Sequence, residues 1–473
     1  MPVRDEALAP APGPGPAPYR GLESYRAEDV RYFFGREKLV ARLVALVTSV
    51  ASAGPVALVG PPGCGKSSAL GAGLAARLRD TGSWEIVSFT PGPRPLASLD
   101  AAMATVRELG SRPGAKVALI VDQFEELFTL GAPAAEWDAF ARRLADPPSD
   151  STGTGTGPGT GTGPAISVVI ALRADFYGVA LGCEALSRTL QDRQIVVGPM
   201  TDADLRRAVT EPARAAGVRL DPGLVELVVH DPGELPLLSF ALLRTWLRGG
   251  RDRLALDDHL AVGGVSGAVR AAADAVHEGL TPAQRELARR LFVRLVAIAE
   301  KVPDTRRRLA VADLVRDHPG SDGTSEVIAR FAAAGLLTSD GTNVTIAHEA
   351  ILSAWPRLRD WTDAERAGLV TRRRLAETAR AWERDGRDPR VLLTGAELDT
   401  ARSWADDPVH SGALDAVQRA LVDASTTVAR RESARARRRA LRGRIALVAT
   451  SVLAVVASGV AGVAMVRGPA AGA

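Results

Sequence analysis

Residues 60–67, GPPGCGKS, match the pattern GxxxxGK[ST]. An apolar run, PVALVG, leads into them, and a helix-forming segment, SSALGAGLAARLRD, follows. In this context the backbone N–H groups of the loop cradle phosphate oxygens. Lys66 reaches the β- and γ-phosphates, and Ser67 binds Mg²⁺. The pattern predicts a nucleotide phosphate site that consists of Gly60, Pro61, Pro62, Gly63, Cys64, Gly65, Lys66, Ser67 and Ser68.

Three carboxylates end a second apolar run, VALIVDQFEE over 117–126. An acid after such a strand holds Mg²⁺-bound water beside the phosphate loop, and a nearby glutamate polarises the attacking water. Asp122 fits the first role and is, with Ser67, the expected metal ligand. Either Glu125 or Glu126 fits the second role, because the sequence does not tell which side chain faces the nucleotide. Capping a helix is the usual role of a lone Asp here, but the upstream loop favours catalysis.

A cation follows a third apolar run. Arg173 comes directly after ISVVIAL, residues 166–172. Ligands of parallel α/β sheets collect at the carboxyl ends of the strands, so Arg173 can contact the γ-phosphate. A solvated arginine fits the residues equally well.

A sheet must bring these groups together. Fully apolar runs separated by helical stretches predict a parallel sheet with helices on both faces, an α/β P-loop NTPase core over residues 19–200. A Gly-, Thr- and Pro-rich tract at 149–164 is expected to form a surface loop, and the Pro/Gly/Ala-rich residues 1–18 a free tail. The expected strands lie at 55–60, 85–89, 116–121, 166–172 and 194–198.

Helical patterns dominate the rest of the chain. Residues 201–280 predict a helical subdomain, and Thr281 with Gln284 forms a capping box that opens a new unit. Two short helices and a hairpin at Asp340-Gly341 then predict a winged helix over 281–360. A second capping box at Thr362 is expected to open the helical region 361–444.

The composition argues against a wholly disordered chain, a collagen-like sequence and a polytopic membrane protein. Hydrophobic residues make up 46% and charged residues 24%, which is typical of globular chains. The net charge is +4. Residues 430–444 hold eight arginines and one glutamate, so the preceding part is mildly acidic and predicts no general affinity for nucleic acid.

The basic cluster precedes 22 uncharged residues at 445–466. At about 1.5 Å per residue this segment spans roughly 33 Å, enough to cross a bilayer as a helix. The arginines are expected on the cytoplasmic side. No signal peptide opens the sequence MPVRDEALAP. We therefore expect a single-pass protein of the cell membrane with a cytoplasmic body and a short tail at 467–473.

Six segments in order resemble the novel STAND-type NTPases, a bacterial branch of the signal-transduction ATPases with numerous domains. The resemblance covers about residues 18–430 and rests on PYRGLESYRAEDVRYFFGRE, VGPPGCGKSSALGAGL, VALIVDQFEELFTL, VVIALRADFYG, GELPLLSFALLRTW and VTIAHEAILSAWPRLRDW. It implies an AAA+-related ATPase core, a helical subdomain and a winged helix. It also implies a closed ADP-bound state and an open ATP-bound state that forms homo-oligomers.

The resemblance also implies roles for individual residues. It places Gly35, Arg36 and Glu37 near the adenine and Pro236 on the base side, and it makes Arg173 the sensor of the γ-phosphate. By a looser analogy His348 contacts the β-phosphate of ADP, while a structural role at the start of a helix stays open. Unlike many members, this sequence shows no repeat sensor domain and no effector domain.

Together these features predict a membrane-anchored ATPase that acts as a signalling switch with ATP or ADP and Mg²⁺, and with an unknown protein effector or sensor as partner. One alternative is a transcription regulator whose winged helix reads DNA. Its helix at 326–334 has only Arg330 as a cation, whereas the arginines at 306–308 keep this alternative open. Another alternative is a nucleotide-bound scaffold that does not hydrolyse ATP.

Overall fold

A computed structural model describes residues 17–49, 54–112, 114–130, 132–145, 165–298, 304–316, 323–406 and 415–439. The chain divides into two compact units, Met1–Thr362 and Asp363–Ala473. The predicted low-complexity loop at 149–164 and the predicted membrane span at 445–466 lie outside the described residues. Within the described ranges, no helix is both long and apolar enough to cross a membrane.

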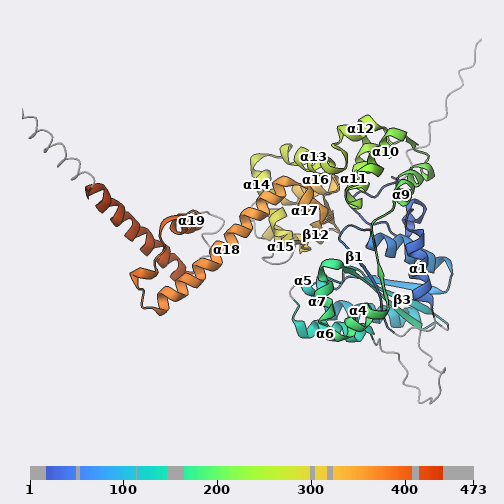
Figure 1. The fold of residues 1–473 in the computed structure, drawn as a ribbon, viewed down its shortest axis with the longest axis horizontal. Coiled ribbons are helices and arrows are strands. Elements are labelled where there is room, and N and C mark those ends of the chain that lie inside the picture. The colour runs from blue at the N-terminus through green and yellow to red at the C-terminus, as the bar shows by residue number, and fades with distance from the viewer. Residues whose placement is uncertain are drawn as a thin grey trace, which may run out of the picture. The chain divides into compact units, whose positions relative to one another are not determined.

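A parallel sheet of five strands forms the centre of the part of the first unit that contains the loop at 60–67 (Figure 1). The strand order is β2-β3-β4-β1-β5, so β4 lies between β1 and β3. In the register of β1 and β4, Gly60 pairs with Arg173, which places the start of the phosphate loop beside the arginine. The predicted parallel α/β sheet is confirmed. Its strands are β1 (Val56–Gly60), β2 (Trp84–Phe89), β3 (Lys116–Val121), β4 (Ala165–Arg173) and β5 (Gln194–Val196).

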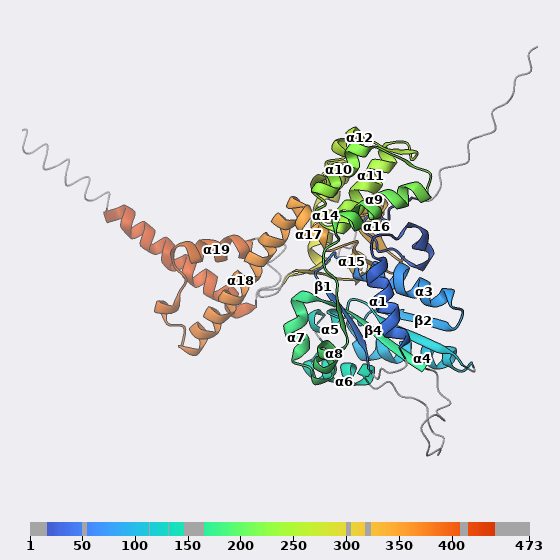
Figure 2. The same cartoon turned by 45° about the vertical axis from the view of Figure 1, so that its right-hand side comes forward.

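Helices cover both faces of this sheet (Figure 2). Along β3, Val117, Leu119 and Val121 belong to one buried cluster, and Ala118 and Ile120 to another. This alternation is what a strand buried on both sides requires. One face packs against α1 (Glu37–Thr48), η2 (Ala69–Ala75) and α3 (Ala76–Asp80), and the other against α4 (Pro95–Gly110), α6 (Ala134–Ala145) and α8 (Glu184–Asp192). Shorter elements of this region are η1 (Ala27–Tyr32), α2 (Lys66–Ser68), α5 (Glu126–Thr129), η3 (Ala174–Phe176) and α7 (Tyr177–Leu181).

A helical region follows the sheet. Its elements are α9 (Asp202–Ala215), β6 (Arg219–Leu220), α10 (Pro222–His230), α11 (Leu235–Arg248), β7 (Arg253–Leu254), α12 (Leu256–Ala261) and α13 (Gly264–Glu278). The N-terminal segment inserts into it: Tyr19 is buried, and its hydroxyl donates to the carbonyl of Val209 at 2.6 Å. A few residues on, the Tyr25 N–H donates to Ser68 Oγ at 3.1 Å. Residues 19–25 therefore connect the helical region with the helix that follows the phosphate loop.

The last part of the first unit combines helices with a small antiparallel sheet of order β10-β12-β11. The capping box of Thr281 and Gln284 is confirmed. The hairpin is confirmed too, since β11 and β12 flank Asp340-Gly341 and Gly341 has a φ of +87°. The elements are α14 (Pro282–Arg294), β8 (Val296–Ala297), β9 (Thr305–Arg306), β10 (Leu309–Ala310), α15 (Val311–Arg316), α16 (Thr324–Ala333), β11 (Leu337–Ser339), β12 (Asn343–Ile346) and α17 (Ala350–Ala354).

The second predicted capping box is wrong. Thr362 lies inside α18 (Pro356–Arg384), and its hydroxyl donates to the carbonyl of Arg359 at 2.9 Å. The helix begins six residues earlier at Pro356, which suits a first turn because proline lacks the N–H that would stay unpaired there.

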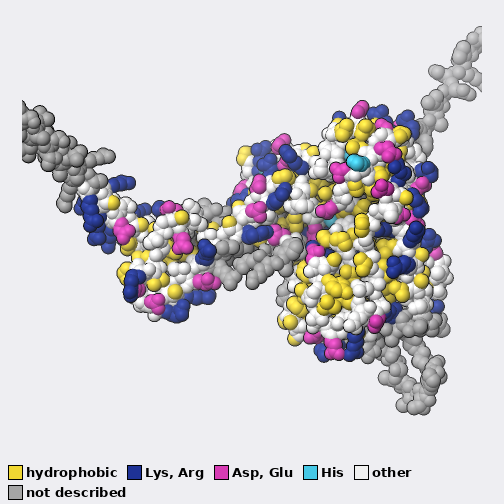
Figure 3. Space-filling model, in the orientation of Figure 1, with side chains coloured by type: hydrophobic (Ala, Val, Ile, Leu, Met, Phe, Trp, Pro, Cys, Tyr) yellow, Lys and Arg dark blue, Asp and Glu magenta, His cyan; other side chains and the backbone are white. Residues whose placement is uncertain are grey.

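The second unit contains the rest of α18, η4 (Pro389–Val391), α19 (Gly395–Asp406) and a helix over 416–439. Leu375, Trp382, Ala401 and Leu421 form its buried core. Residues 430–439 are exposed, and Figure 3 shows Lys and Arg side chains gathered at this end of the helix.

Candidate functional site

The phosphate loop has the shape that the motif predicts. Gly63 and Gly65 have φ values of +71° and +93°, a backbone conformation that residues with a Cβ rarely adopt. Lys66 is buried at the start of the following helix. Its ammonium donates to the carbonyls of Gly60 at 2.8 Å and Pro61 at 2.9 Å. The loop thus curls around the lysine, whose charge lies where phosphate oxygens would approach.

Ser67 and Asp122 meet beside this loop through a side-chain hydrogen bond. Burial raises the pKa of Asp122, while the hydrogen bond from Ser67 and the charge of Lys66 act in the opposite direction. A hydroxyl and a carboxylate are hard oxygen donors, which Mg²⁺ prefers when nucleotide phosphates complete its shell. The residues present therefore fit the predicted metal.

The two candidate glutamates point in different directions. Glu125 is buried and lines the cavity described below, and burial raises its pKa to about 7. Glu126 does not line that cavity, and its carboxylate accepts the N–H of Gly92 at 3.0 Å. A left-handed backbone at Gln123, with a φ of +52°, turns the chain between the strand and these residues. Of the two glutamates, Glu125 is thus the one that faces the cavity.

Arg173 ends β4 and is only 4% exposed. Its guanidinium forms ion pairs with Asp175 at 2.5 Å and with Glu349, and its Nε is buried without a partner. Its backbone N–H donates to Glu125 at 3.3 Å. Arg173 is therefore a buried cation at the carboxyl edge of the sheet, and the solvated alternative is wrong.

Residues from the 304–349 part of the chain reach the same edge. His348 Nδ1 accepts the N–H of Ala350 at 3.1 Å, so the ring proton is on Nε2. Burial and the positive charges of Arg306 and Lys66 lower the pKa of His348 to about 3, and the ring is neutral near pH 7. Arg306 donates to Gln123 Oε1 at 3.1 Å and to the carbonyl of Ala347 at 2.8 Å.

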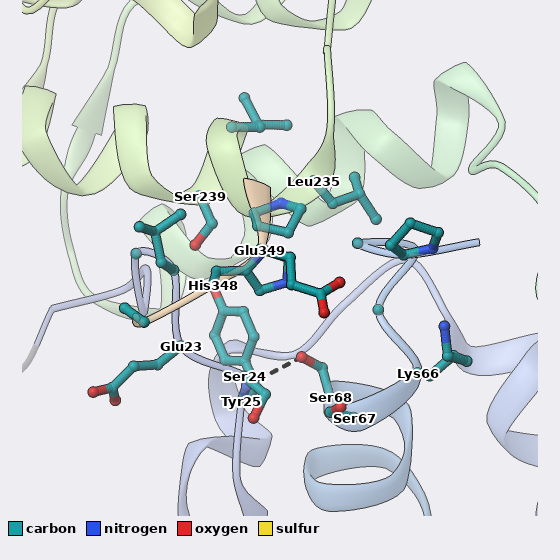
Figure 4. A pocket seen from close by; sticks show the side chains of 18 of the residues that line it. Glu23, Ser24, Tyr25, Lys66, Ser67, Ser68, Leu235, Ser239, His348 and Glu349 are labelled. Carbon is teal, nitrogen blue, oxygen red and sulfur yellow. Dashed lines mark hydrogen bonds between the residues drawn. The ribbon is translucent and has the colours of Figure 1, made fainter. Parts of the chain in front are cut away.

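These groups enclose one cavity of about 370 Å³. Figure 4 shows His348 and Glu349 in its middle, between Ser239 and Leu235 on one side and Ser67 and Ser68 on the other. The predicted residues that line it are Pro62, Gly63, Gly65, Lys66, Ser67, Ser68, Asp122, Glu125, Arg173, Pro236 and His348. The cavity therefore collects candidate residues from five separate parts of the sequence.

Other predicted residues do not line the cavity, and each has a structural contact instead. Arg36 donates to the carbonyls of Gly198 and Cys64, both at 2.9 Å. Gly35 has a φ of +83°, and a Cβ there would lie 2.4 Å from the carbonyl oxygen of Asp204. The predicted residues outside the lining are Gly35, Arg36, Glu37, Gly60, Pro61, Cys64 and Glu126. Arg36 therefore holds the phosphate loop against the end of the sheet.

The sequence matches the family described as Novel STAND NTPase 1 over residues 18–390. The chain belongs to this family. The family resemblance seen in the sequence is thereby confirmed, and the protein is a STAND-type P-loop NTPase by descent. None of the curated proteins matches the sequence significantly.

Solved structures with a distant likeness to this STAND NTPase include two ORC proteins and a RuvB protein. The ORC1 protein of Aeropyrum pernix in complex with DNA is 15% identical, with 68% of this chain and 92% of that chain covered and a TM-score of 0.38. The ORC2 protein of Aeropyrum pernix with ADPNP and ADP is 14% identical, with 70% and 94% covered and a TM-score of 0.39. The RuvB branch migration motor of Thermotoga maritima is 17% identical, with 70% and 97% covered and a TM-score of 0.33.

Among the residues of the STAND NTPase cavity that the sequence did not predict are Gln123, Arg306 and Glu349. The sequence connects Arg306 only with the DNA-binding alternative and gives Gln123 and Glu349 no role. Glu349 directly follows His348 in the segment that carried the family resemblance, which is the one signal that could have found it.

Proposed function

We propose that the protein is a nucleotide-dependent signalling switch that binds ATP or ADP with Mg²⁺ and hydrolyses ATP slowly. One observation carries this proposal. A single cavity joins the phosphate loop and the carboxylates of the sheet to His348, Arg306 and Glu349 from a different part of the chain. A nucleotide in this cavity would contact both parts, and contacts made in only one conformation are what bias a two-state protein.

The residues of the sheet have the functions that phosphoryl transfer requires. Bound Mg²⁺ would supply charge neutralisation at the phosphates, with Ser67 and Asp122 as its protein ligands. Lys66 would exchange its carbonyl partners for phosphate oxygens. Glu125, a buried residue of the cavity lining, would orient the attacking water and accept its proton.

The segment beyond residue 281 would act as the moving part. We assign α14, α15, α16 and the sheet of β10, β11 and β12 to a winged helix, on the strength of three helices followed by a hairpin. The proton on His348 Nε2 suits donation to a phosphate oxygen of ADP in the closed state. In the ATP-bound state this part would move away and allow a homo-oligomer to form, which would signal to a protein partner.

Two observations weaken the alternative of a DNA-binding regulator. Arg306 points inward and contacts Gln123, and Arg308 forms an ion pair with Asp340. On the helix before the hairpin, Arg330 pairs with Glu326 at 2.6 Å. Arg306, Arg308 and Arg330 thus have partners within the chain. Among the described residues this leaves the exposed Arg307 as the remaining cation of the cluster at 306–308, whereas DNA binding needs several cations on one face.

Nucleotide binding by the full chain, purified in detergent, tests the proposal. We expect wild type to bind ATP and ADP with Mg²⁺ and to release phosphate slowly, and Lys66→Ala to lose binding of both nucleotides in calorimetry. Lys38→Ala, on the exposed side of α1, is the matched control and should bind like wild type. Equal binding by wild type and Lys66→Ala would contradict the proposal. Binding without turnover would favour the scaffold alternative.

We further propose that the protein is anchored in the cell membrane by residues 445–466, with its body in the cytoplasm. The exposed arginines at the end of the 416–439 helix support this, because they belong to the basic cluster at 430–444 that directly precedes the uncharged segment. Deletion of 445–466 should release the protein from the membrane fraction, while deletion of 152–163 should leave its location unchanged. Continued sedimentation of the first variant with membranes would instead indicate binding of the arginines to anionic lipid.

A further inference from the structure

Arg173 and Glu349 form an ion pair between distant parts of the chain. Their side chains are 5% and 22% exposed, and both residues line the cavity. Asp175, the second partner of Arg173, follows it by two residues and belongs to the same edge of the sheet. Glu349 directly precedes α17, in the part of the chain beyond residue 281. Asp175 thus stays beside Arg173 in any conformation of the sheet edge, whereas Glu349 belongs to the segment that would move.

Two carboxylates already neutralise the charge of Arg173, which affects whether a γ-phosphate can bind it. The guanidinium makes contacts with two carboxylates, and of its nitrogens only Nε is left without a partner. A γ-phosphate that bound Arg173 would bring further negative charge next to Glu349. Like charges at such distances in a partly buried site repel strongly. ADP has no γ-phosphate and leaves the pair intact.

We propose that Glu349 determines the nucleotide preference of the protein by occupying Arg173 in place of a γ-phosphate. This inference rests on the proposed nucleotide switch. ATP binds tightly only after the segment with Glu349 has moved away from Arg173, and ADP binds with the pair in place. Glu349 therefore favours ADP in the closed state, and by linkage ATP favours the open state.

A second carboxylate lies close to the phosphate loop and provides a matched control. A Cβ at Gly63 would lie 3.3 Å from Glu234 Oε2, and the charge of Glu349 contributes to the raised pKa of Glu234, after the larger effect of burial. Within the described residues Glu234 forms no ion pair with Arg173. Replacing either glutamate by glutamine removes one negative charge near the loop, but only Glu349→Gln frees Arg173.

The experiment compares the affinities of the full chain, in detergent with Mg²⁺, for ADP and for the slowly hydrolysed analogue ATPγS. Glu349→Gln should lower the ATPγS-to-ADP ratio of dissociation constants roughly tenfold, within the usual range of about 5–150-fold for coupled sites. Glu234→Gln should change the ratio by less than about threefold, as expected for a partly exposed charge. In an Arg173→Gln background, Glu349→Gln should leave the ratio unchanged.

Three outcomes would overturn the inference: an unchanged ratio in Glu349→Gln, an equal shift in Glu234→Gln, or a full shift in the Arg173→Gln background. Thermal melting without nucleotide identifies a variant that is merely unfolded. In that case Glu349→Asp, which keeps the charge but is shorter, should give a smaller shift in the same direction, and no shift would count against the inference. Failure of wild type to bind either nucleotide would instead refute the proposed function itself.

Discussion

The two sides of the cavity are held in place in different ways. On the sheet side, Asp122 and Glu125 follow a strand whose last five residues are completely buried, and Lys66 is fixed by carbonyls of its own loop. On the other side, Arg306 and Glu349 reach the cavity through contacts between side chains, with Gln123 and Arg173. Lys66, Asp122 and Glu125 thus belong to segments that follow strands β1 and β3 of one sheet, whereas Arg306 and Glu349 depend on partners 183 and 176 positions away in the chain.

The largest effect is expected for a change on the sheet side of the cavity. Glu125→Gln should keep nucleotide binding but lower the turnover of ATP by at least about 100-fold, the usual contribution of a positioned general base. Glu126→Gln is the control and should stay within about threefold of wild type, because Glu126 binds the Gly92 N–H instead of facing the cavity. Phosphate release at saturating Mg²⁺ and ATP measures both variants. An equal loss of turnover in both variants would contradict the assignment of Glu125 as the general base.

The pH dependence of turnover sharpens the same test. Burial raises the pKa of Glu125 to about 7, so the carboxyl takes up a proton as the pH falls through 7 and can then no longer accept one from water. The kcat/KM, which reports the free enzyme, should therefore fall about tenfold per pH unit below 7. The residual activity of Glu125→Gln should lack this dependence. A wild-type profile that is flat between about pH 5.5 and 7 would contradict the assignment, because a base with a pKa of about 7 loses most of its deprotonated form over that range.

A smaller effect is expected on the side of the cavity formed by Arg306, His348 and Glu349. His348→Ala should weaken ADP about tenfold more than ATPγS, the size expected for one lost hydrogen bond to a charged phosphate. It should also raise the oligomeric fraction at a fixed nucleotide concentration. Calorimetry and light scattering measure the two quantities.

A purely structural role of His348 predicts a different result. Its Nδ1 accepts the Ala350 N–H, so loss of the ring would then lower the melting temperature and leave the ratio of ADP to ATPγS affinities unchanged. His348→Asn keeps an acceptor for this N–H and separates the two roles. If Asn restores stability without restoring the ratio, the phosphate contact is the function of the ring.

Local patterns in the sequence predicted the sheet side well. The loop at 60–67 and the acid at 122 both follow apolar strands, and a parallel sheet brings the carboxyl ends of its strands to one edge. The choice between Glu125 and Glu126 depends on the turn at Gln123, whose left-handed backbone no residue type required. The direction in which a side chain points after the end of a strand depends on the folded backbone and not on the sequence pattern alone.

The other side could not be predicted in this way. Glu349 lies 176 residues after Arg173 in the chain, and Arg306 lies 183 residues after Gln123. No periodicity or spacing indicates pairs so far apart. Thr362 illustrates the opposite error: the pattern of a capping box was present, but the preceding residues from Pro356 already formed a helix. A cap requires a chain that is not yet helical, and this depends on neighbours outside the motif.

The contacts of Tyr19 bear on how the protein is made. Tyr19 is among the first described residues to leave the ribosome, yet the carbonyl that its hydroxyl binds belongs to Val209, 190 residues later. At about 5–20 residues per second, synthesis of the intervening chain takes roughly 10–40 seconds. During that time the strands of the sheet can already pair, while Tyr19, which lines the cavity, still lacks its hydrogen-bond partner Val209. The cavity can therefore be completed only after the chain has been synthesised beyond Val209, late in biosynthesis.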